Sequence, residues 1–500
     1  MPSLDDDFLA LPLTGLADAA LARAQALGCS HADVRIERIK QAFRIFRDGK
    51  LQTNTDDEVF GISVRVVHDG AWGFAADITL TTAAAALLAD RAVATARVSR
   101  PLTLEPVELA PEPTYREATW VSEYQINPFE VPEADKQTRM LELSERLLSA
   151  DGVNHADASL WYVQENKFYA DLAGTSTTQQ RVRIQPELTA VCVNERGFSS
   201  MRTLAPPVGR GWEYLVGTGW DFDLEIAQLP EYLAEHVKAP SVEAGLSDLV
   251  IDPSNLFLTI HESVGHATEL DRALGYEAAY AGTSFATFDQ LGTLAYGSPA
   301  MNVTGDRVVE HGLSSIGYDD EGVAGQSFDI VKNGTLVGYQ LNRQMAAAKG
   351  LGRSNGCAYA DSPGHIPMQR MPNVSLQPDA GGPSTEELIG RVDSGIYIVG
   401  DKSWSIDMQR YNFQFTGQRF YRIVNGRLAG QVRDVAYQAT TTDFWGSMEA
   451  VGNEDTYVLG GAFNCGKGQP GQTAPVSHGS PSALFRGVNV LNTTAEGDQK

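Results

Sequence analysis

The 500-residue sequence has few cysteines, a deficit of basic residues and no long apolar run. Its four cysteines lie far apart, which excludes the dense disulfide framework of a small secreted domain. Lys and Arg number 39 against 63 Asp and Glu, and the net charge of −24 argues against direct binding of nucleic acid or of an anionic membrane surface. The Ala- and Leu-rich stretch after Thr82 is interrupted by Asp90 and Arg91, so it is too short to span a membrane.

The first residues also lack the order of a signal peptide. Residues 1–10 are acidic, whereas a signal peptide has a basic segment followed by an apolar one. We therefore expect a cytoplasmic protein with reduced thiols. Because 500 residues exceed the usual size of one domain, we expect an N-terminal α/β region at residues 1–240 and a C-terminal region at 241–500.

Residues 14–97 are predicted to form a helix, an antiparallel meander of strands and a second helix. The first helix covers 14–28 and ends at a glycine. The strands that follow alternate apolar and polar residues, and Asp-Gly pairs at 48–49 and 69–70 are typical of tight hairpin turns. An Ala-rich helix is expected over about 81–97, followed by a proline-containing linker.

Short motifs of this first unit recur later in the chain. The tripeptide His-Ala-Asp at 31–33 returns at 155–157, and the dipeptide Gly-Phe at 73–74 returns at 197–198. Both offsets are 124 residues, and an internal duplication is the economical explanation. The two repeats would span about residues 14–97 and 138–237.

From about residue 295 onward, short apolar segments alternate with tight turns. Asn-Gly pairs at 333–334 and 425–426 are strong hairpin signals. We therefore predict a β-rich C-terminal region, either a barrel or a sandwich, with a helix at 251–270 packed on it. The fold class is accordingly α+β, with a duplicated N-terminal helix-plus-antiparallel-sheet region.

The helix predicted at 251–270 carries His261, Glu262 and His266 two to three turns from its start. Pro253 has the fixed φ that suits a first helical turn, and the body of the helix is apolar enough to be buried. Two imidazoles flanking a carboxylate on a buried helix indicate a zinc site with a general base.

The spacing of the two histidines differs from the common H-E-x-x-H pattern. Residues i and i+4 lie about 40° apart around an ideal helix, whereas i and i+5 lie about 140° apart, too far for one metal ion. A π-type turn would return His261 and His266 to one face. Gly265, inside the motif, weakens the regular helix and would ease this distortion. We therefore predict a locally distorted helix.

A zinc site needs a third protein ligand and, for catalysis, an open position for water. Cys29 lies at a helix end and Cys192 in an apolar strand, where a small hydrophobic residue fits. Cys465 lies in a glycine-rich segment that we interpret as a loop, and Lys467 nearby would favour its thiolate. The residue pattern alone favours Cys465, with Cys357, a histidine or an acidic residue as alternatives.

Three motifs resemble, in the same order along the chain, those of the TldD/PmbA family of metallopeptidases. They are H-E-S-V-G-H at 261–266, G-Y-D-D-E-G-V-A-G-Q at 317–326 and C-G-K-G-Q-P at 465–470. Because the family's non-catalytic partner subunits lack the zinc motif, this chain is similar to the catalytic subunit.

The resemblance implies a zinc peptidase in which His261, His266 and Cys465 bind zinc and Glu262 is the catalytic carboxylate. It implies cleavage of unfolded or small peptides, including leader removal, inside a dimer. That dimer is either a homodimer or a heterodimer with a related non-catalytic subunit. Two alternatives remain: a non-catalytic scaffold subunit with a structural zinc, and a zinc amidohydrolase acting on amides other than peptides.

Other polar and aromatic residues are given simpler interpretations. The cluster Asp319-Asp320-Glu321 is interpreted as a solvated turn rather than as a site for a substrate amine or a second cation. His311 and His365 are interpreted as loop histidines. Core packing is favoured over a peptide-binding groove for four aromatic residues, Trp212, Tyr214, Trp404 and Tyr411.

Overall fold

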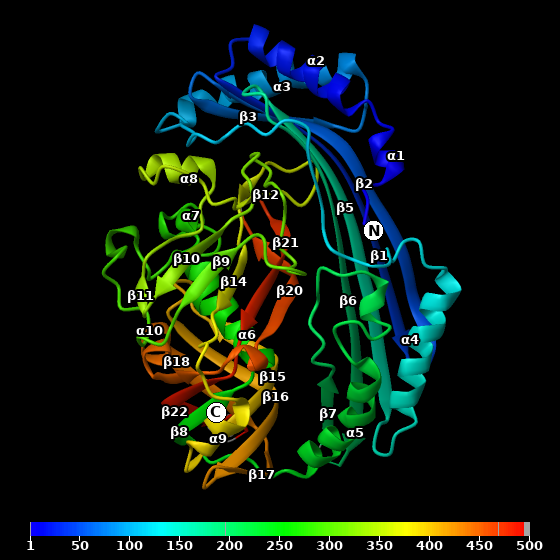
Figure 1. Ribbon diagram of the computed structural model, residues 1–500, viewed down its shortest axis with the longest axis vertical. Coiled ribbons are helices and arrows are strands. Elements are labelled where there is room, and N and C mark those ends of the chain that lie inside the picture. Colours follow the sequence, from blue (N-terminus) through cyan, green and yellow to red (C-terminus); the bar gives the residue numbers. More distant parts are fainter. Residues whose placement is uncertain (1, 196, 469, 495–500) are drawn as a thin grey trace.

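A long, curved antiparallel sheet from the first half of the chain lies beside a β-rich C-terminal region (Figure 1). The structure is a computed structural model and describes residues 2–195, 197–468 and 470–494. Helices and strands both contribute substantially, so the α+β class is confirmed. Gln469 of the C-G-K-G-Q-P motif lies outside the described residues.

The order helix, three strands, helix occurs twice in the N-terminal region. A short helix, α1 (Asp6–Leu9), precedes the first unit. That unit contains α2 (Leu13–Ala26), β1 (His31–Arg47), β2 (Lys50–His68), β3 (Ala71–Asp77) and α3 (Thr82–Ser99). The second contains α4 (Glu133–Leu148), β5 (His155–Asp171), β6 (Ser176–Asn194), β7 (Gly197–Arg202) and α5 (Phe222–Lys238).

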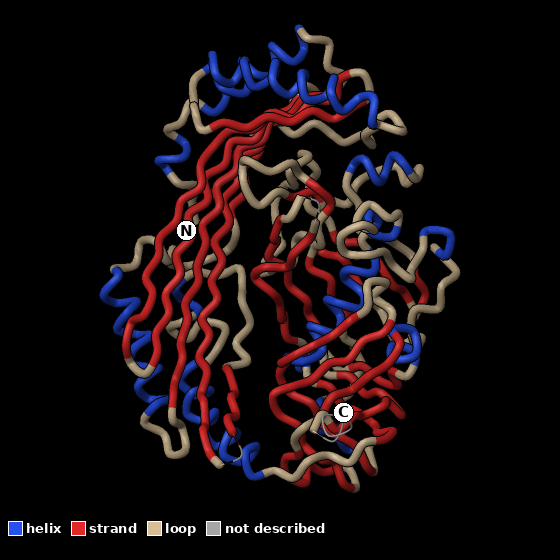
Figure 2. The backbone as a smooth tube through the Cα atoms, turned by 180° about the vertical axis from the view of Figure 1, so that it is seen from behind, coloured by secondary structure: helices blue, strands red, loops and turns tan. Residues whose placement is uncertain are grey.

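The two units join through their first strands into one seven-stranded sheet, whose long strands run side by side in Figure 2. Strand β1 pairs antiparallel with β5, and Lys40 lies opposite Gln164. These two residues are 124 positions apart, so equivalent positions of the two repeats face each other, as a duplication with local two-fold symmetry requires. The segment between the units adds β4 (Ala118–Val121), parallel to β6.

Each pair of helices covers its own part of the sheet and encloses a separate apolar core. Leu16 of α2 and Leu88 of α3 pack with Val64 of β2. Met140 of α4 and Leu229 of α5 belong to a second cluster over β5 and β6. Within the described residues, no helix is both long and apolar enough to cross a membrane.

The hairpin turns predicted from Asp-Gly and Asn-Gly pairs are confirmed. Asp48 and Gly49 both have positive φ, 49° and 68°, and Asn333 and Gly334 have 47° and 78°. A two-residue turn with both residues in this left-handed region matches the twist of paired strands. Such turns fix the register of β1 with β2 and of β10 (Ser327–Lys332) with β11 (Thr335–Leu336).

Of the two architectures predicted for the C-terminal region, the structure contains a barrel. Five strands follow one another around it, and the β15–β16 pairing closes the circle. They are β15 (Ser394–Ile406), β8 (Gly245–Ile251), β22 (Ala483–Asn492), β18 (Val435–Thr440) and β16 (Asn412–Val424). Helix α6 (Pro253–Ile260) leaves directly from β8, so the barrel fixes where the helix begins.

Shorter elements extend the barrel and cover its surroundings. Strands β17 (Arg427–Val432) and β19 (Met448–Val451) pair with barrel strands. Strands β9 (Val303–Asp306) and β14 (Asn373–Leu376) pair with each other beside β10. The region also contains two pairs of strands, β12 (Ala358–Tyr359) with β13 (Met368–Gln369) and β20 (Val458–Lys467) with β21 (Gln472–Ser480). Four short helices lie among them: α7 (Leu270–Ala273), α8 (Arg343–Ala348), α9 (Thr385–Gly390) and α10 (Thr441–Gly446).

Buried ion pairs hold the long sheet against the C-terminal region. Lys167 Nζ lies 2.8 Å from Asp320 Oδ2, and Arg65 Nη1 lies 3.1 Å from Glu321 Oε1. Asp319 accepts backbone N–H bonds from Glu321, Val323 and Ala358. The interpretation of 319–321 as a solvated turn is therefore wrong, because all three carboxylates are buried, Asp319 against backbone N–H groups and the other two against basic residues far away in the sequence.

Candidate metal centre

The histidine-bearing helix is distorted as its sequence predicts. Helix α6 begins at Pro253 after Asp252, whose side chain accepts the Ser254 N–H at 2.9 Å. It is followed by a five-residue π-helical turn at His261–Gly265 and a 3₁₀ turn at His266–Thr268. The wider π turn compensates for the i, i+5 spacing and brings both imidazoles to the same side.

Gly265 fits this turn for a different reason from the one predicted. Its φ of −53° is ordinary for a right-handed helix, so backbone freedom is not required there. A Cβ at this position would lie 2.6 Å from Sδ of Met371, a buried side chain packed against the turn. The absence of a side chain therefore allows Met371 to approach closely.

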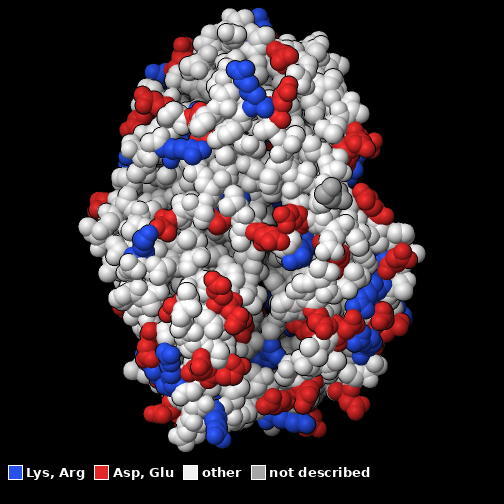
Figure 3. Space-filling view, in the orientation of Figure 1, with Lys and Arg blue, Asp and Glu red and all other residues white. Residues whose placement is uncertain are grey.

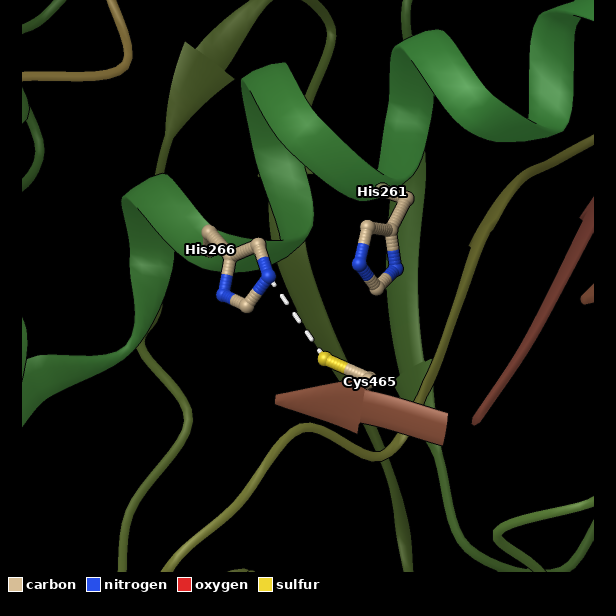
Figure 4. Close-up of side chains that lie close together, drawn as sticks. All are labelled: His261, His266 and Cys465. Atoms are coloured by element: carbon tan, nitrogen blue, oxygen red, sulfur yellow. Dashed lines mark hydrogen bonds between the residues drawn. The ribbon is translucent and has the colours of Figure 1, made fainter. Parts of the chain in front are cut away.

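His261, His266 and Cys465 point toward one another (Figure 4). The ring centroids of the two histidines are 4.7 Å apart, and His266 Nε2 lies 3.5 Å from Cys465 Sγ. Potential ligand atoms of all three residues lie within 4.8 Å of one another. All three side chains are buried, with exposures of 4–6%. The structure thus brings together the three residues that the resemblance implies.

Two details of the sequence interpretation of this segment are wrong. Cys465 lies in strand β20 rather than in a loop, just after an irregularity in the β20–β21 pairing. Lys467 does not face the thiol, because its ammonium lies 2.8 Å from Asp271 and 3.1 Å from Glu269. Cys357, the alternative ligand, is buried elsewhere, with its Sγ 4.0 Å from Asn355 O.

Hydrogen bonds to the outer ring nitrogens orient both histidines. His478 Nδ1 lies 2.8 Å from Val374 O, so it donates there and its Nε2 accepts from His261 Nδ1 at 2.7 Å. His266 Nδ1 donates to Glu269 Oε2 at 3.0 Å. Both arrangements turn Nε2 toward the shared space, which is the usual orientation of metal-binding histidines.

The charges of the three residues depend on one another. Burial acts to raise the pKa of the Cys465 thiol, but the imidazoles of His266 and His261 hold it well below its usual range. Burial acts to lower the pKa of His266, and the thiolate overcomes this and raises it to about 9. A buried thiolate beside two oriented imidazoles is a donor set that suits zinc, and it leaves a fourth position for water or substrate.

Glu262 lies beside these ligands and forms an ion pair with Arg410. Burial acts to raise the pKa of Glu262, and the charges of His261, His266 and Arg410 together hold it below its usual range. The carboxylate is therefore ionised and able to accept a proton. The sequence gives no spacing signal for Arg410 or for His478, which reach the site from distant strands and turns.

A cavity of about 280 Å³ reaches Asn464, the residue before Cys465, and the side chain of Trp404, which hydrogen-bonds to Glu262. It is lined by residues of β20, α6 and the barrel, including Phe257, Trp404, Phe463 and Asn464. In Figure 3 this side of the molecule is hollowed between the long sheet and the C-terminal region. Trp404 is half-exposed here, so core packing is the wrong interpretation for it, whereas Trp212 and Tyr214 are buried.

The two loop histidines are satisfied by local contacts. His365 Nδ1 lies 2.6 Å from Asp361 Oδ1, and His311 Nε2 lies 2.9 Å from Glu310 Oε1. His311 also forms a partly exposed group with Glu310 and Glu123. Exposed acidic groups of this kind are common at surfaces, and nothing else among the described residues marks this one as a metal site.

Comparisons with known proteins identify the family of the chain. Residues 244–492 match the family model described as the PmbA/TldA metallopeptidase C-terminal domain, and residues 32–96 match PmbA/TldA metallopeptidase domain 1. A metalloprotease of Methanothermobacter thermautotrophicus is 27% identical over 98% of this chain and 100% of its own length. A zinc metalloprotease TldD homolog of Saccharolobus solfataricus is 25% identical over 94% of this chain and 98% of its own.

Solved structures share the fold. A Thermotoga maritima protein described as a modulator of a DNA gyrase has a TM-score of 0.76 at 17% identity, covering 95% of this chain and 99% of that one. TldE of Thermococcus kodakarensis has a TM-score of 0.71 at 13% identity, covering 94% and 98%. With the domain matches and the near full-length relatives, these findings show that the chain belongs to the TldD/PmbA family of metallopeptidases.

Proposed function

We propose that the chain is a zinc-dependent peptidase that hydrolyses peptide bonds of unfolded or small peptides. The observation that carries this proposal is the buried convergence of His261, His266 and Cys465 beside the ionised Glu262. The name of the Saccharolobus relative, which specifies zinc, supports the choice of metal. Zinc held by these residues would supply a water of lowered pKa and polarise the scissile carbonyl.

The protein's own residues would complete the reaction. Glu262 would accept the proton of the attacking water and return it to the leaving amine. His478 and Glu269 hold the two imidazoles in their binding orientation. Among the described residues, β20 pairs only with β21. An extended peptide can therefore add to its other edge, which gives affinity with little side-chain preference.

The assembly and location are part of the same proposal. A neighbour in fold is named TldE, and we propose that this chain forms a dimer with a copy of itself or with a related non-catalytic subunit. The proposed location is the cytoplasm, with reduced thiols, and all four cysteines are free in the structure. Peptides are the proposed partners; nucleic acid and membranes are not.

Metal analysis combined with cleavage of unfolded casein tests the function. Wild-type protein should contain bound zinc, and Glu262→Gln should retain it while turnover falls about 10²–10⁴-fold. Cys465→Ala should lose both zinc and cleavage, whereas the matched variant Cys357→Ala removes another buried thiol and should keep both.

Other outcomes separate the alternatives. Bound zinc without cleavage, alone or with a related subunit, would favour the scaffold. Cleavage of small non-peptide amides but not of peptides would favour an amidohydrolase. Wild-type protein isolated without metal would contradict all three hypotheses: the peptidase, the scaffold with a structural zinc and the amidohydrolase.

A further inference from the structure

Arg410 reaches the metal centre from a tightly constructed turn after β15. Asp407 accepts backbone N–H bonds from Gln409, Tyr411 and Asn412 through its side chain. Arg410 itself has a φ of 62°, and its carbonyl oxygen accepts the Thr441 hydroxyl. A non-glycine residue in this left-handed region is unusual and needs support from its surroundings. The turn therefore holds Arg410 in a conformation that glycine would adopt more readily.

The Arg410 guanidinium has hydrogen-bond donors that its contacts within the protein leave unpaired. Nη1 donates to Glu262 Oε2, and the side chain is largely buried. Its Nε is buried and has no hydrogen-bond partner. A guanidinium carries five N–H donors in a rigid fork, so the ion pair with Glu262 leaves donors beside the reacting centre.

We propose that Arg410 is a further catalytic residue, which fixes Glu262 through one N–H and donates another to the carbonyl oxygen of the bound peptide. This inference rests on the proposed peptidase function. When water adds to the carbonyl carbon, its proton passes to Glu262 and negative charge develops on the carbonyl oxygen. The C–N bond then breaks, and the amine leaves with that proton.

The charge balance of the site supports this role. The Cys465 thiolate and the Glu262 carboxylate would offset the two positive charges of a zinc ion. Arg410 adds one further positive charge, which is paired with Glu262 before the reaction. Once Glu262 has taken the proton and is neutral, the Arg410 charge can stabilise the negative charge on the substrate oxygen. A fixed donor in a water-poor site stabilises such a charge without having to reorganise.

Arg410→Gly is the appropriate variant because glycine adopts positive φ without strain. It should keep the fold and the zinc content, while kcat for an internally quenched peptide falls about 10²–10³-fold and KM changes little. Arg410→Lys keeps the positive charge but lacks the forked guanidinium donors, so its kcat should lie between those of the wild type and Arg410→Gly. Asn425→Gly is the matched control, since it changes another positive-φ residue in a hairpin turn and should match the wild type.

Guanidinium ion at a sub-denaturing concentration should restore part of the turnover of Arg410→Gly, whereas urea should not. Several results would overturn the inference: unchanged or increased kcat in Arg410→Gly, loss of its zinc, or no difference between guanidinium and urea. Wild-type protein that cleaves no peptide would overturn the proposed function together with this inference. Wild-type cleavage that persists in Arg410→Gly would overturn the inference alone.

Discussion

At the scale of single residues, the proposed metal centre depends on the groups behind its ligands. His261 has its Nε2 available because His478, 217 positions away, accepts from its Nδ1. His478 is fully buried in β21 and is fixed in turn by the Val374 carbonyl. The motif at 261–266 predicts the ligands on the helix, but it contains no information about a partner that only folding brings near.

Replacing His478 should weaken metal binding without removing a ligand. In His478→Leu we expect the Kd for zinc to rise about 10–100-fold, because leucine offers His261 no acceptor to fix its ring. Competition with a chromophoric chelator measures this. His365→Leu changes a histidine whose side chain pairs with Asp361, and it should bind zinc like the wild type. Equal affinity in all three proteins would contradict the orienting role.

At the scale of elements, the sequence predicted the π turn and the hairpin turns because local geometry alone imposes them. It did not predict that Cys465 lies in a strand, since the surrounding glycines resemble a loop. Two of these glycines allow close packing: a Cβ at Gly460 would lie 2.8 Å from Phe257 Cβ, and one at Gly461 would lie 2.6 Å from Val476 O. Such contacts are tertiary and leave no periodic pattern.

Gly265→Ala tests whether close packing, rather than backbone freedom, selects glycine in the π turn. Displacement of Met371 should reduce the free energy of unfolding by about 1–3 kcal/mol, measured by denaturant titration. The same substitution in a Met371→Ala background should cost less, because the obstructing side chain is gone. A gain of about 1 kcal/mol, as helix propensity alone would give, would contradict this explanation.

At the scale of the whole molecule, buried charges join the duplicated sheet to the C-terminal region. The repeated motifs allowed the duplication to be predicted, and β1–β5 pairing explains how the two units form one sheet. The role of Asp320 and Glu321 could not be predicted, because their partners Lys167 and Arg65 lie more than 150 residues away. Without knowledge of these partners, a run of acidic residues is most simply interpreted as exposed to solvent.

The Asp33–Arg65 ion pair should make the free energy of unfolding decrease as the pH falls through the acid range. Burial acts to raise the pKa of Asp33, but Arg65 and His31 lower it to about 2 from 3.8. Because the folded-state pKa is depressed, the stabilisation of about 2 kcal/mol is complete above the unfolded pKa and is lost as pH falls toward 2.

Denaturant unfolding of metal-free protein measures this contribution. The difference in free energy of unfolding between wild type and Asp33→Asn should decrease by about 1 kcal/mol when the pH is lowered from 6 to 3. Asp90→Asn removes a pair with Arg23 that also lowers the pKa of Asp90, but this pair is exposed and screened by solvent, so the decrease should be smaller. A difference that is constant or increases toward pH 3 would show that Asp33 is not held ionised by its partners.

Zinc K-edge X-ray absorption of the protein as isolated tests the central claim most directly. We predict one sulfur neighbour at about 2.3 Å and nitrogen neighbours, including two imidazoles, at about 2.0–2.1 Å. In Cys465→Ser the sulfur neighbour should disappear, and in Cys357→Ser it should remain. Bound zinc with only oxygen and nitrogen neighbours in the wild type, or a sulfur neighbour that survives Cys465→Ser, would contradict the assignment of His261, His266 and Cys465 as its ligands.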